Sequence, residues 1–465
     1  MTRRPTSPAL AAAAVVTAVA AFALLALAIA PVSAAPQQPS EPDAVESLPQ
    51  DDEPVTIVLE GGQRAQIRLA FPDTEGVAAL GGDPGRGARE LDSTLRADLQ
   101  ATRIFQIQGP WAFTALTLTG DRGHDFEQYR SVGNEIVLLG SVASEPGGRL
   151  VFEGRLYDLA SGQAILAKRY RGPLSSARRI AHTFADEVVQ FLAGRRGIAL
   201  TRIAFTSDRS GAKEIFLMDY DGANQRPITA HRSTSLAATW HPNGAHVAYT
   251  SFVGGSPAIY RAELATGRKT ALVTDGDQNI SPSYSPDGRR IVFSRALGAN
   301  SEIFAADADG SNARRLTHSN AIDASPAWSP KGHEIAFTSS RAGNPHVYLM
   351  DAEGANLRRL TFDGNYNDGA AWDLEGDKLA YASRRRGSFD VAVTELSTLD
   401  TRVLSSAPGS HEEPTFSPDG RRIAFSSTRT GAKQVWVMDA DGANPQALTG
   451  AGRNESPAWS GYPPR

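Results

Sequence analysis

Four short stretches of this chain carry closely spaced acidic side chains and could in principle bind a metal ion. They share the pattern Asp-x-Asp/Glu-Gly-x-Asn and begin at Asp219, Asp307, Asp351 and Asp439. Calcium takes carboxylate and amide oxygens, but an EF-hand loop also has a third spaced acid and a distal glutamate. These stretches lack both features, and an Asp-Gly turn between two strands accounts for the same residues. We therefore interpret them as hairpin turns and expect no metal or other cofactor.

The composition excludes several classes of chemistry. The chain has 465 residues and no cysteine, so disulfides, thiolate metal sites and thiol redox reactions are excluded. Lysine and arginine number 47 against 51 aspartates and glutamates. Because this balance leaves no broad basic surface, we expect no nucleic-acid partner.

The first 54 residues differ in composition from the rest. Ala9–Ala30 are uncharged and apolar, follow Arg3 and Arg4, and precede the small-residue pattern Val-Ser-Ala that ends at Ala34. This pattern predicts a removable signal peptide over residues 1–34, although the apolar stretch is also long enough for a retained membrane anchor. Residues 35–54 contain six acids, five prolines and no base, which predicts a disordered linker.

A period of 44 residues runs through the second half of the chain. Hydrophobic strand starts recur at Ile203, Val247, Ile291, Ile335, Leu379 and Ile423. Each unit contains four short strands, here called A to D. This period predicts a six-bladed β-propeller over residues 198–465. The array begins on a strand B at Arg202 and ends on a strand A, the SPAWS of Ser456–Ser460. We expect this last strand to pair with the first ones and close the ring, because closure removes exposed strand edges.

The loops of the repeats indicate which end of the propeller binds a partner. The A–B and C–D turns are nearly identical between copies, whereas the D–A loops differ from copy to copy, as expected where each loop meets a different part of a ligand. The B–C loops supply the arginines Arg209, Arg295, Arg341, Arg384, Arg385 and Arg429. The D–A loops supply the acids Asp275, Asp277, Asp323, Asp363, Asp368, Glu412, Glu413 and Glu455. The alternative role for these charges is salt bridging between blades.

Residues 55–197 predict a small α/β domain before the propeller. Strands are expected at 55–60, 65–71 and 135–142, and a hairpin over 150–170 turns at Ser161-Gly162. Helices are expected at 88–101 and 176–193. In the second helix, Ile180, Phe184, Val188 and Phe191 share one face, and we interpret His182 as structural.

The junction between the two predicted domains resembles the TolB family of periplasmic propeller proteins. The resemblance is carried by AHTFADEVVQFLAGRRGIALTRIAFTSD (Ala181–Asp208), MDYDGANQ (Met218–Gln225) and the C-terminal SPAWSGYPP. It implies a non-enzymatic, monomeric scaffold of the Tol-Pal system in the periplasm, which supports outer-membrane integrity and envelope constriction at cell division. The implied partners are a Pal-like lipoprotein at the propeller's loop face and a TolA-like inner-membrane protein at the N-terminal segment.

The resemblance also implies site residues. It places lipoprotein contacts near Gln278 and Asn279 in a D–A loop and near Thr338 and Ser339 at a B–C loop. On the same face we include Arg209, Asp323, Arg341, His411 and Glu412 as candidate contacts. The N-terminal partner segment is Val55, Thr56, Ile57 and Val58.

Two other functional classes remain open. A propeller hydrolase of the prolyl oligopeptidase kind needs a G-x-S-x-G nucleophile elbow, which this sequence lacks. A propeller lactonase needs a channel calcium, for which Asn279, Asp323 and Asp368 offer oxygens. The second class, after these two kinds of enzyme, is a periplasmic peptide or glycan sensor, because one fold hosts many functions.

Overall fold

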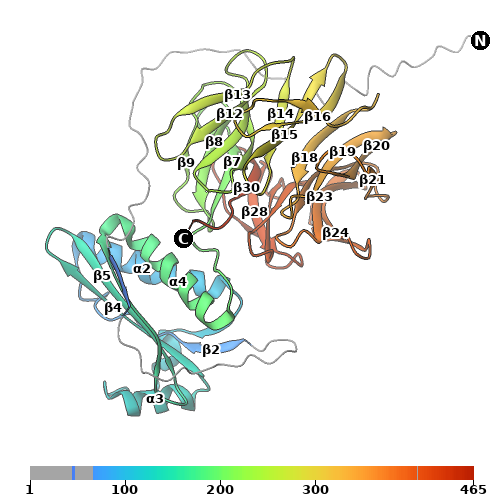
Figure 1. The fold of residues 1–465 in the computed structure, drawn as a ribbon. Coiled ribbons are helices and arrows are strands. Elements are labelled where there is room, and N and C mark those ends of the chain that lie inside the picture. Colours follow the sequence, from blue (N-terminus) through green and yellow to red (C-terminus); the bar gives the residue numbers. More distant parts are fainter. Residues whose placement is uncertain (1–43, 48–65, 406, 465) are drawn as a thin grey trace, which may run out of the picture.

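The computed structural model describes residues 44–47, 66–405 and 407–464, which form an α/β domain and a β-propeller (Figure 1). The predicted signal peptide over 1–34 and the segment Val55–Val58 lie outside the described residues. Within the described ranges, no helix combines the length and the hydropathy needed to cross a bilayer.

One mixed sheet organises the N-terminal domain. In spatial order it contains β1 (Ala44–Ser47), β6 (Ala164–Pro173), β5 (Arg149–Asp158), β4 (Ile136–Glu145), β2 (Ile67–Ala70) and β3 (Phe105–Gln108). Its helices are α2 (Gly82–Ala101), α3 (Arg122–Ser131) and α4 (Ala177–Ala193), with the short turns η1 (Pro110–Phe113) and η2 (Leu174–Ser176). β4, β5 and β6 are antiparallel neighbours, and β2 runs parallel to both β3 and β4.

Alternation along the strands gives this sheet two buried faces. On one face Leu138 and Phe152 pack with Leu91 of α2 and Phe184 of α4. Residues of opposite parity on the same strands, together with α3 and η1, form a smaller cluster on the other face. Phe191 is 43% exposed, so the predicted buried face of α4 is wrong at this residue: in the last turn the buried stripe runs through Val188 and Leu192 instead.

The predicted linker differs from the structure at residues 44–47. These residues form β1, which pairs antiparallel with β6, and Glu46 lies 3.6 Å from Arg169. The acidic, proline-rich composition predicted no strand here, but β6 offers an unpaired backbone edge whose hydrogen bonds do not depend on side-chain type. The other residues of the predicted linker lie outside the described part of the chain.

Six four-stranded antiparallel sheets form the propeller. Blade 1 contains β30 (Asn454–Trp459), β7 (Arg202–Ser207), β8 (Glu214–Asp219) and β9 (Arg226–Pro227). Blade 2 contains β10 (Ser235–Trp240), β11 (His246–Ser251), β12 (Ala258–Glu263) and β13 (Lys269–Val273). Blade 3 contains β14 (Asn279–Tyr284), β15 (Arg290–Leu297), β16 (Asn300–Asp307) and β17 (Arg314–Arg315). Blade 4 contains β18 (Asp323–Trp328), β19 (Glu334–Ala342), β20 (Asn344–Asp351) and β21 (Arg358–Arg359). Blade 5 contains β22 (Asn367–Trp372), β23 (Lys378–Arg385), β24 (Ser388–Glu395) and β25 (Thr401–Val403). Blade 6 contains β26 (His411–Phe416), β27 (Arg422–Ser427), β28 (Gln434–Asp439) and β29 (Gln446–Ala447).

The predicted closure of the ring is confirmed. The last strand, β30, pairs antiparallel with the first propeller strand, β7, with Asn454 opposite Ser207 and Trp459 opposite Ile203. The indole Nε1 of Trp459 also donates to Thr201 Oγ1 at 2.9 Å. Neither β7 nor β30 therefore exposes an unpaired edge at this seam.

Each inner strand carries a bulge that the hydrophobic pattern did not predict. The register shifts within all six A–B pairs. The third residue of each strand has a positive φ, at Ala237, Ser281, Ser325, Gly369, Glu413 and Ser456. The first residue of each inner strand, two positions before the bulge, is buried in all six blades.

Candidate partner-binding face

The propeller has two structurally distinct ends. We call the end formed by the A–B and C–D turns the turn end, and the end formed by the B–C and D–A loops the rim. The N-terminal domain contacts the turn end: Tyr220 donates to Asp98 at 2.7 Å, and Arg195 lies 3.0 Å from Asp419. These contacts leave the rim, on the far side of the blades, available to a partner.

The Asp-x-Asp/Glu-Gly-x-Asn stretches are hairpin turns of the turn end. In the copy that starts at Asp219, Asn224 Nδ2 donates to Asp219 Oδ2 at 2.7 Å, and the same bond joins Asp439 and Asn444. The asparagines have positive φ, and Gly222 has a φ of 89° and no room for a Cβ, which would lie 2.7 Å from the backbone oxygen of Leu448. Turn geometry therefore explains each residue of the pattern.

Asn279, Asp323 and His411 are the first residues of inner strands, whereas the sequence placed them in D–A loops. All three are buried. Asn279 Oδ1 accepts from Arg295 Nε at 2.8 Å, Asp323 lies 2.8 Å from Arg341, and His411 Nε2 lies 3.0 Å from the Ala407 oxygen. Burial raises the pKa of Asp323, although Ser339 and Arg341 oppose the shift, and burial lowers the pKa of His411.

The rim arginines bond within their own blades. Arg341 reaches Ser339 and Asp323 of blade 4. Arg209 donates to Asn454 Oδ1 at 2.7 Å. This bond joins the B–C loop of blade 1 to β30, the inner strand of the same blade. The expected salt bridges between blades are therefore replaced, for these two arginines, by bonds that hold each loop onto its own sheet.

The remaining candidates differ in exposure. Thr338 and Ser339 lie inside β19, not at a loop; Thr338 Oγ1 donates to Asp368 at 2.7 Å, and Ser339 is fully buried. Gln278 is exposed and Glu412 is half-buried. Of the sequence-predicted contacts, Gln278 is exposed and Glu412, Arg209 and Arg341 are half-buried, whereas Asn279, Asp323, Thr338, Ser339 and His411 are buried beneath this surface.

Sequence reasoning missed an apolar part of the rim. Val253 and Leu297 are 42% and 40% exposed, and they occupy the repeat position at which four other blades carry an arginine. Gln278 lies beside Leu297, because its backbone oxygen accepts from the amide of the adjacent Ala296 at 3.0 Å. We call Val253, Leu297 and Gln278 the apolar arc. The repeats contain the evidence for this apolar surface, because the arginine found in the other four blades is replaced in blades 2 and 3.

The inner strands add a second asymmetry. Their second residues are apolar in blades 2 to 4 (Leu236, Ile280 and Ala324) and acidic in blades 5, 6 and 1 (Asp368, Glu412 and Glu455). Lys433 lies among the acids, 3.2 Å from Glu412. Burial lowers the pKa of Lys433, but Glu413 and its neighbours outweigh this and raise it, so the lysine stays charged. The rim thus combines an apolar half with an acidic half.

A buried polar layer under the rim was also missed. Glu214 begins β8 of blade 1, Glu302 is the third residue of β16 in blade 3, and both are buried. Thr317 Oγ1 donates to Glu302 at 2.6 Å, while Thr229 Oγ1 and the Arg232 amide donate to Glu214. A buried carboxylate needs such donors, and their regular spacing of 88 residues was visible in the sequence.

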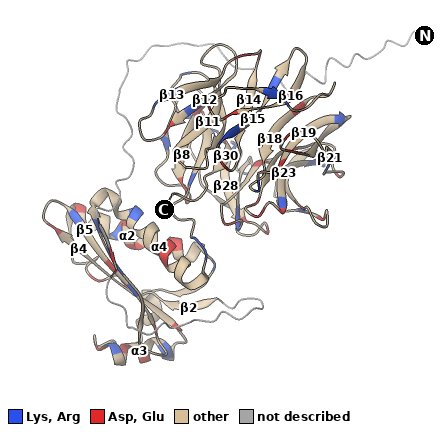
Figure 2. Cartoon of the chain, in the orientation of Figure 1, with Lys and Arg blue, Asp and Glu red and all other residues tan. Residues whose placement is uncertain are grey.

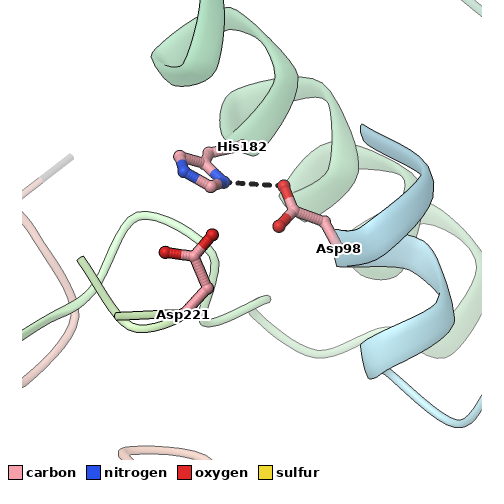
Figure 3. A group of neighbouring side chains, drawn as sticks. All are labelled: Asp98, His182 and Asp221. Carbon is pink, nitrogen blue, oxygen red and sulfur yellow. Dashed lines mark hydrogen bonds and ion pairs between the residues drawn. The ribbon is translucent and has the colours of Figure 1, made fainter. Parts of the chain in front are cut away.

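One cluster of potential metal ligands occurs among the described residues, and it lies at the domain interface. Figure 3 shows Asp98 of α2, His182 of α4 and Asp221 of the first C–D turn pointing toward one another. His182 Nδ1 lies 2.6 Å from Asp98, and the Arg178 guanidinium lies 2.5 Å from Asp221. Because Arg178 already supplies the cation, this cluster is explained as an ionic contact between the domains. Two of the residues suggested above as ligands of a lactonase calcium already accept hydrogen bonds from arginines: Asn279 accepts from Arg295, and Asp323 accepts from Arg341.

Charge is distributed over the whole molecule. Figure 2 shows Lys and Arg together with Asp and Glu on both domains, with neither sign confined to one of them. This pattern agrees with the near balance of charges in the sequence.

Comparison with known proteins decides the family. A model of the TolB amino-terminal domain matches residues 55–165, and a model of the TolB beta propeller domain matches residues 189–463. The chain belongs to the TolB family. The TolB relatives include the Tol-Pal system protein TolB of Geobacter metallireducens, which is 41% identical over 36% of this chain and 39% of its own. The Protein TolB homolog of Chlorobium chlorochromatii is 35% identical over 35% of this chain and 37% of its own.

These alignments span about two fifths of the curated relatives' length. Among solved structures, TolB from Acinetobacter baumannii superposes with a TM-score of 0.71 at 23% identity, over 90% of this chain and 99% of that one. This TolB structure supports the fold, an α/β domain followed by a six-bladed propeller.

Proposed function

We propose that this chain is a non-enzymatic scaffold of the Tol-Pal system that acts in the periplasm. Its rim binds a Pal-like lipoprotein, and the segment Val55–Val58 binds a TolA-like inner-membrane protein. One observation supports this proposal above the others: both TolB domain models match this one chain in order, and its N-terminal domain leaves the rim uncovered. By linking the two envelope layers, the scaffold supports outer-membrane integrity and constriction at division.

The chemistry of the rim defines what the lipoprotein must present. Exposed apolar residues at the centre of an interface contribute most of its binding energy, and charges at its edge direct the encounter. The apolar arc offers Val253 and Leu297, and the acidic half offers Glu412. The lipoprotein surface is therefore expected to combine an apolar patch with basic side chains.

A binding measurement with matched variants tests the rim. Val253→Asp combined with Leu297→Asp should weaken binding of the soluble domain of the Pal-like lipoprotein by at least roughly tenfold, or about 1.4 kcal/mol. The control is Leu374→Asp with Leu399→Asp, which changes two leucines that are 45% and 56% exposed on turn-end loops. Equal affinities of the two double variants would reject the rim as the binding face.

The N-terminal arm requires its own assay. Removing residues 55–58 should abolish binding of the TolA-like protein's soluble domain and leave lipoprotein binding unchanged. If the shortened chain still binds the TolA-like domain, the assignment of Val55–Val58 is wrong.

A further inference from the structure

A cleft between the two domains is lined by arginines. Its volume is about 1060 Å³, and it lies at the turn end of blade 1, with Pro463 and Pro464 of the C-terminal tail on one side. Its charged side chains are Arg178, Arg179, Arg202, Arg226, Glu90 and Asp219, so arginines outnumber acids by four to two. This excess of positive charge is unlike the rest of the near-neutral chain.

Two acids near this cleft, Asp219 and Asp221, form their ion pairs with Arg178 of α4 and not with the propeller arginines. Arg178 of α4 lies 2.5 Å from Asp221 and 3.7 Å from Asp219. Asp219 also accepts from Asn224 at 2.7 Å. Its carboxylate is therefore already shared between α4 and its own turn.

Arg202 and Arg226 lack an acidic partner within hydrogen-bonding distance among the described residues. The Arg202 guanidinium lies 5.5 Å from the ring centre of Trp240, an interaction that does not neutralise its charge. Burial lowers the pKa of both arginines, and the charge of Arg226 lowers that of Arg202 further, whereas the charge of Asp219 opposes the shift of both. Two mutually repelling guanidinium groups in a cleft would be stabilised by an anion.

Blade 3 shows what these two repeat positions do when an acid is present. Arg290 and Arg314 occupy the positions of Arg202 and Arg226, each displaced by 88 residues. Arg290 lies 2.8 Å from Glu353 Oε1, and Arg314 pairs with Glu353 Oε2, so one carboxylate is held by both. Arg290 also lies over Trp328, as Arg202 does over Trp240.

The carboxylate is missing from the corresponding position beside blade 1. Glu353 belongs to the C–D turn of the next blade, and the residue at that position after blade 1 is Ala265, which is exposed. We propose that Arg202 and Arg226 bind a carboxylate group from a ligand outside this chain, in the manner of Arg290, Arg314 and Glu353. The volume of the cleft admits a small di- or tricarboxylate or the acidic side chains of a peptide.

Calorimetric titration of the full chain with citrate at constant ionic strength tests this proposal. We expect saturable binding that Arg202→Gln with Arg226→Gln weakens at least roughly tenfold. The matched control is Arg290→Gln with Arg314→Gln, which removes the same charge from blade 3 and should leave citrate affinity unchanged. Equal citrate affinity in both double variants would overturn the proposal.

A gain-of-carboxylate variant gives an independent result that does not depend on removing arginines. Ala265→Glu supplies the acid that blade 3 has and should abolish citrate binding, whereas Ala265→Gln should not. Citrate binding that persists in Ala265→Glu would contradict the assigned position.

Further titrations distinguish the source of the carboxylate. Citrate binding that exceeds hexaglutamate binding supports a small metabolite, and the reverse supports an acidic peptide. Sulfate bound as tightly as citrate, or no binding of either carboxylate probe, would overturn the assignment. None of these readouts involves the rim, so they remain valid if the lipoprotein proposal fails.

Discussion

The turn end and the rim of the propeller use the same kinds of polar residue in opposite ways. At the turn end, side chains reach from one domain to the other, as in Arg178 to Asp221 and Arg195 to Asp419. At the rim, arginines such as Arg341 and Arg209 bond inside their own blades. Uniform sequence at one end therefore accompanies a fixed internal contact, whereas variable sequence at the other accompanies a free surface.

Two copies of the C–D turn also differ in their contacts, depending on whether the N-terminal domain packs against them. Asp221 and Asp309 occupy one repeat position in the C–D turns of blades 1 and 3. Asp221 pairs with Arg178 of the N-terminal domain, while Asp309 is exposed and, among the described residues, its carboxylate accepts hydrogen bonds from Ser311 of its own turn. A repeat unit thus acquires a role from what packs against it, which the repeat sequence alone does not specify.

The largest expected effect comes from opening the ring. Removing residues 454–465 deletes β30 and leaves β7 with an unpaired edge. Losing the buried Trp459 alone is worth about 3 to 5 kcal/mol, so the melting temperature should fall by at least about 10 °C. Removing only residues 461–465 should have a much smaller effect. Similar melting curves for both truncations would contradict the role of β30 as the closing strand.

A buried ion pair of the rim provides the next effect. Asp323→Ala should lower the free energy of unfolding by about 3 kcal/mol, because it strands the Arg341 guanidinium without its buried partner. Asp323→Asn keeps the shape and one acceptor and should cost less. Urea denaturation compares the two variants, and an Ala variant as stable as the Asn variant would show that the pair is not needed.

The two copies of the turn offer a matched test of the domain contact. Asp221→Ala should destabilise the protein by about 2 kcal/mol, since it leaves Arg178 half-buried with one acid fewer. Asp309→Ala changes the same position in blade 3 and should cost less than about 0.5 kcal/mol. Equal losses in denaturation experiments would mean that the interdomain pair adds nothing beyond the turn itself.

The smallest effect depends on pH and concerns His182. Burial lowers the pKa of His182, but the bond to Asp98 and the nearby Asp221 outweigh burial and Arg178, so the pKa is raised above 6.5. A raised folded-state pKa stabilises the protein fully below the unfolded value, and this stabilisation is lost as the pH rises through the folded value. The stability difference between the parent and His182→Gln, measured by urea denaturation, should therefore shrink as the pH rises through this window.

His231 supplies the control for that pH dependence. Burial, aided by Lys269, lowers the pKa of His231, so its contribution should have the opposite sign. Denaturation of His231→Gln over the same pH range should show a difference that grows as the pH rises. Parallel pH profiles for the two variants would contradict both assignments.

The repeat period predicted the propeller, its closing strand and its variable end because these follow from regular spacing along the chain. The exact strand starts did not follow, because the bulge at residues such as Ser281 requires a left-handed backbone that hydrophobic patterns do not encode. Asn279 and Asp323 were consequently placed in loops, although each begins a strand and is buried. The apolar arc was not predicted because the candidate contacts were chosen for their charge, and blades 2 and 3 have Val253 and Leu297 where the other four blades have an arginine.

The domain contact was hidden for a different reason. Asp98 and Tyr220 meet at 2.7 Å across 122 residues, and no local pattern connects them. The sequence predicted a structural role for His182, but its partners on α2 and on the propeller turn are seen only in the folded arrangement.

The pairing of β30 with β7 constrains the order of assembly. Blade 1 consists of three strands from the start of the propeller and one from its end. The partner of β7 on its inner edge, β30, is therefore synthesised only after all the other blades. Domains otherwise fold from the N-terminal side during synthesis. The propeller therefore stays open, with an unpaired strand edge at β7, until β30 has been synthesised. Protection of that edge during synthesis is a requirement of the topology.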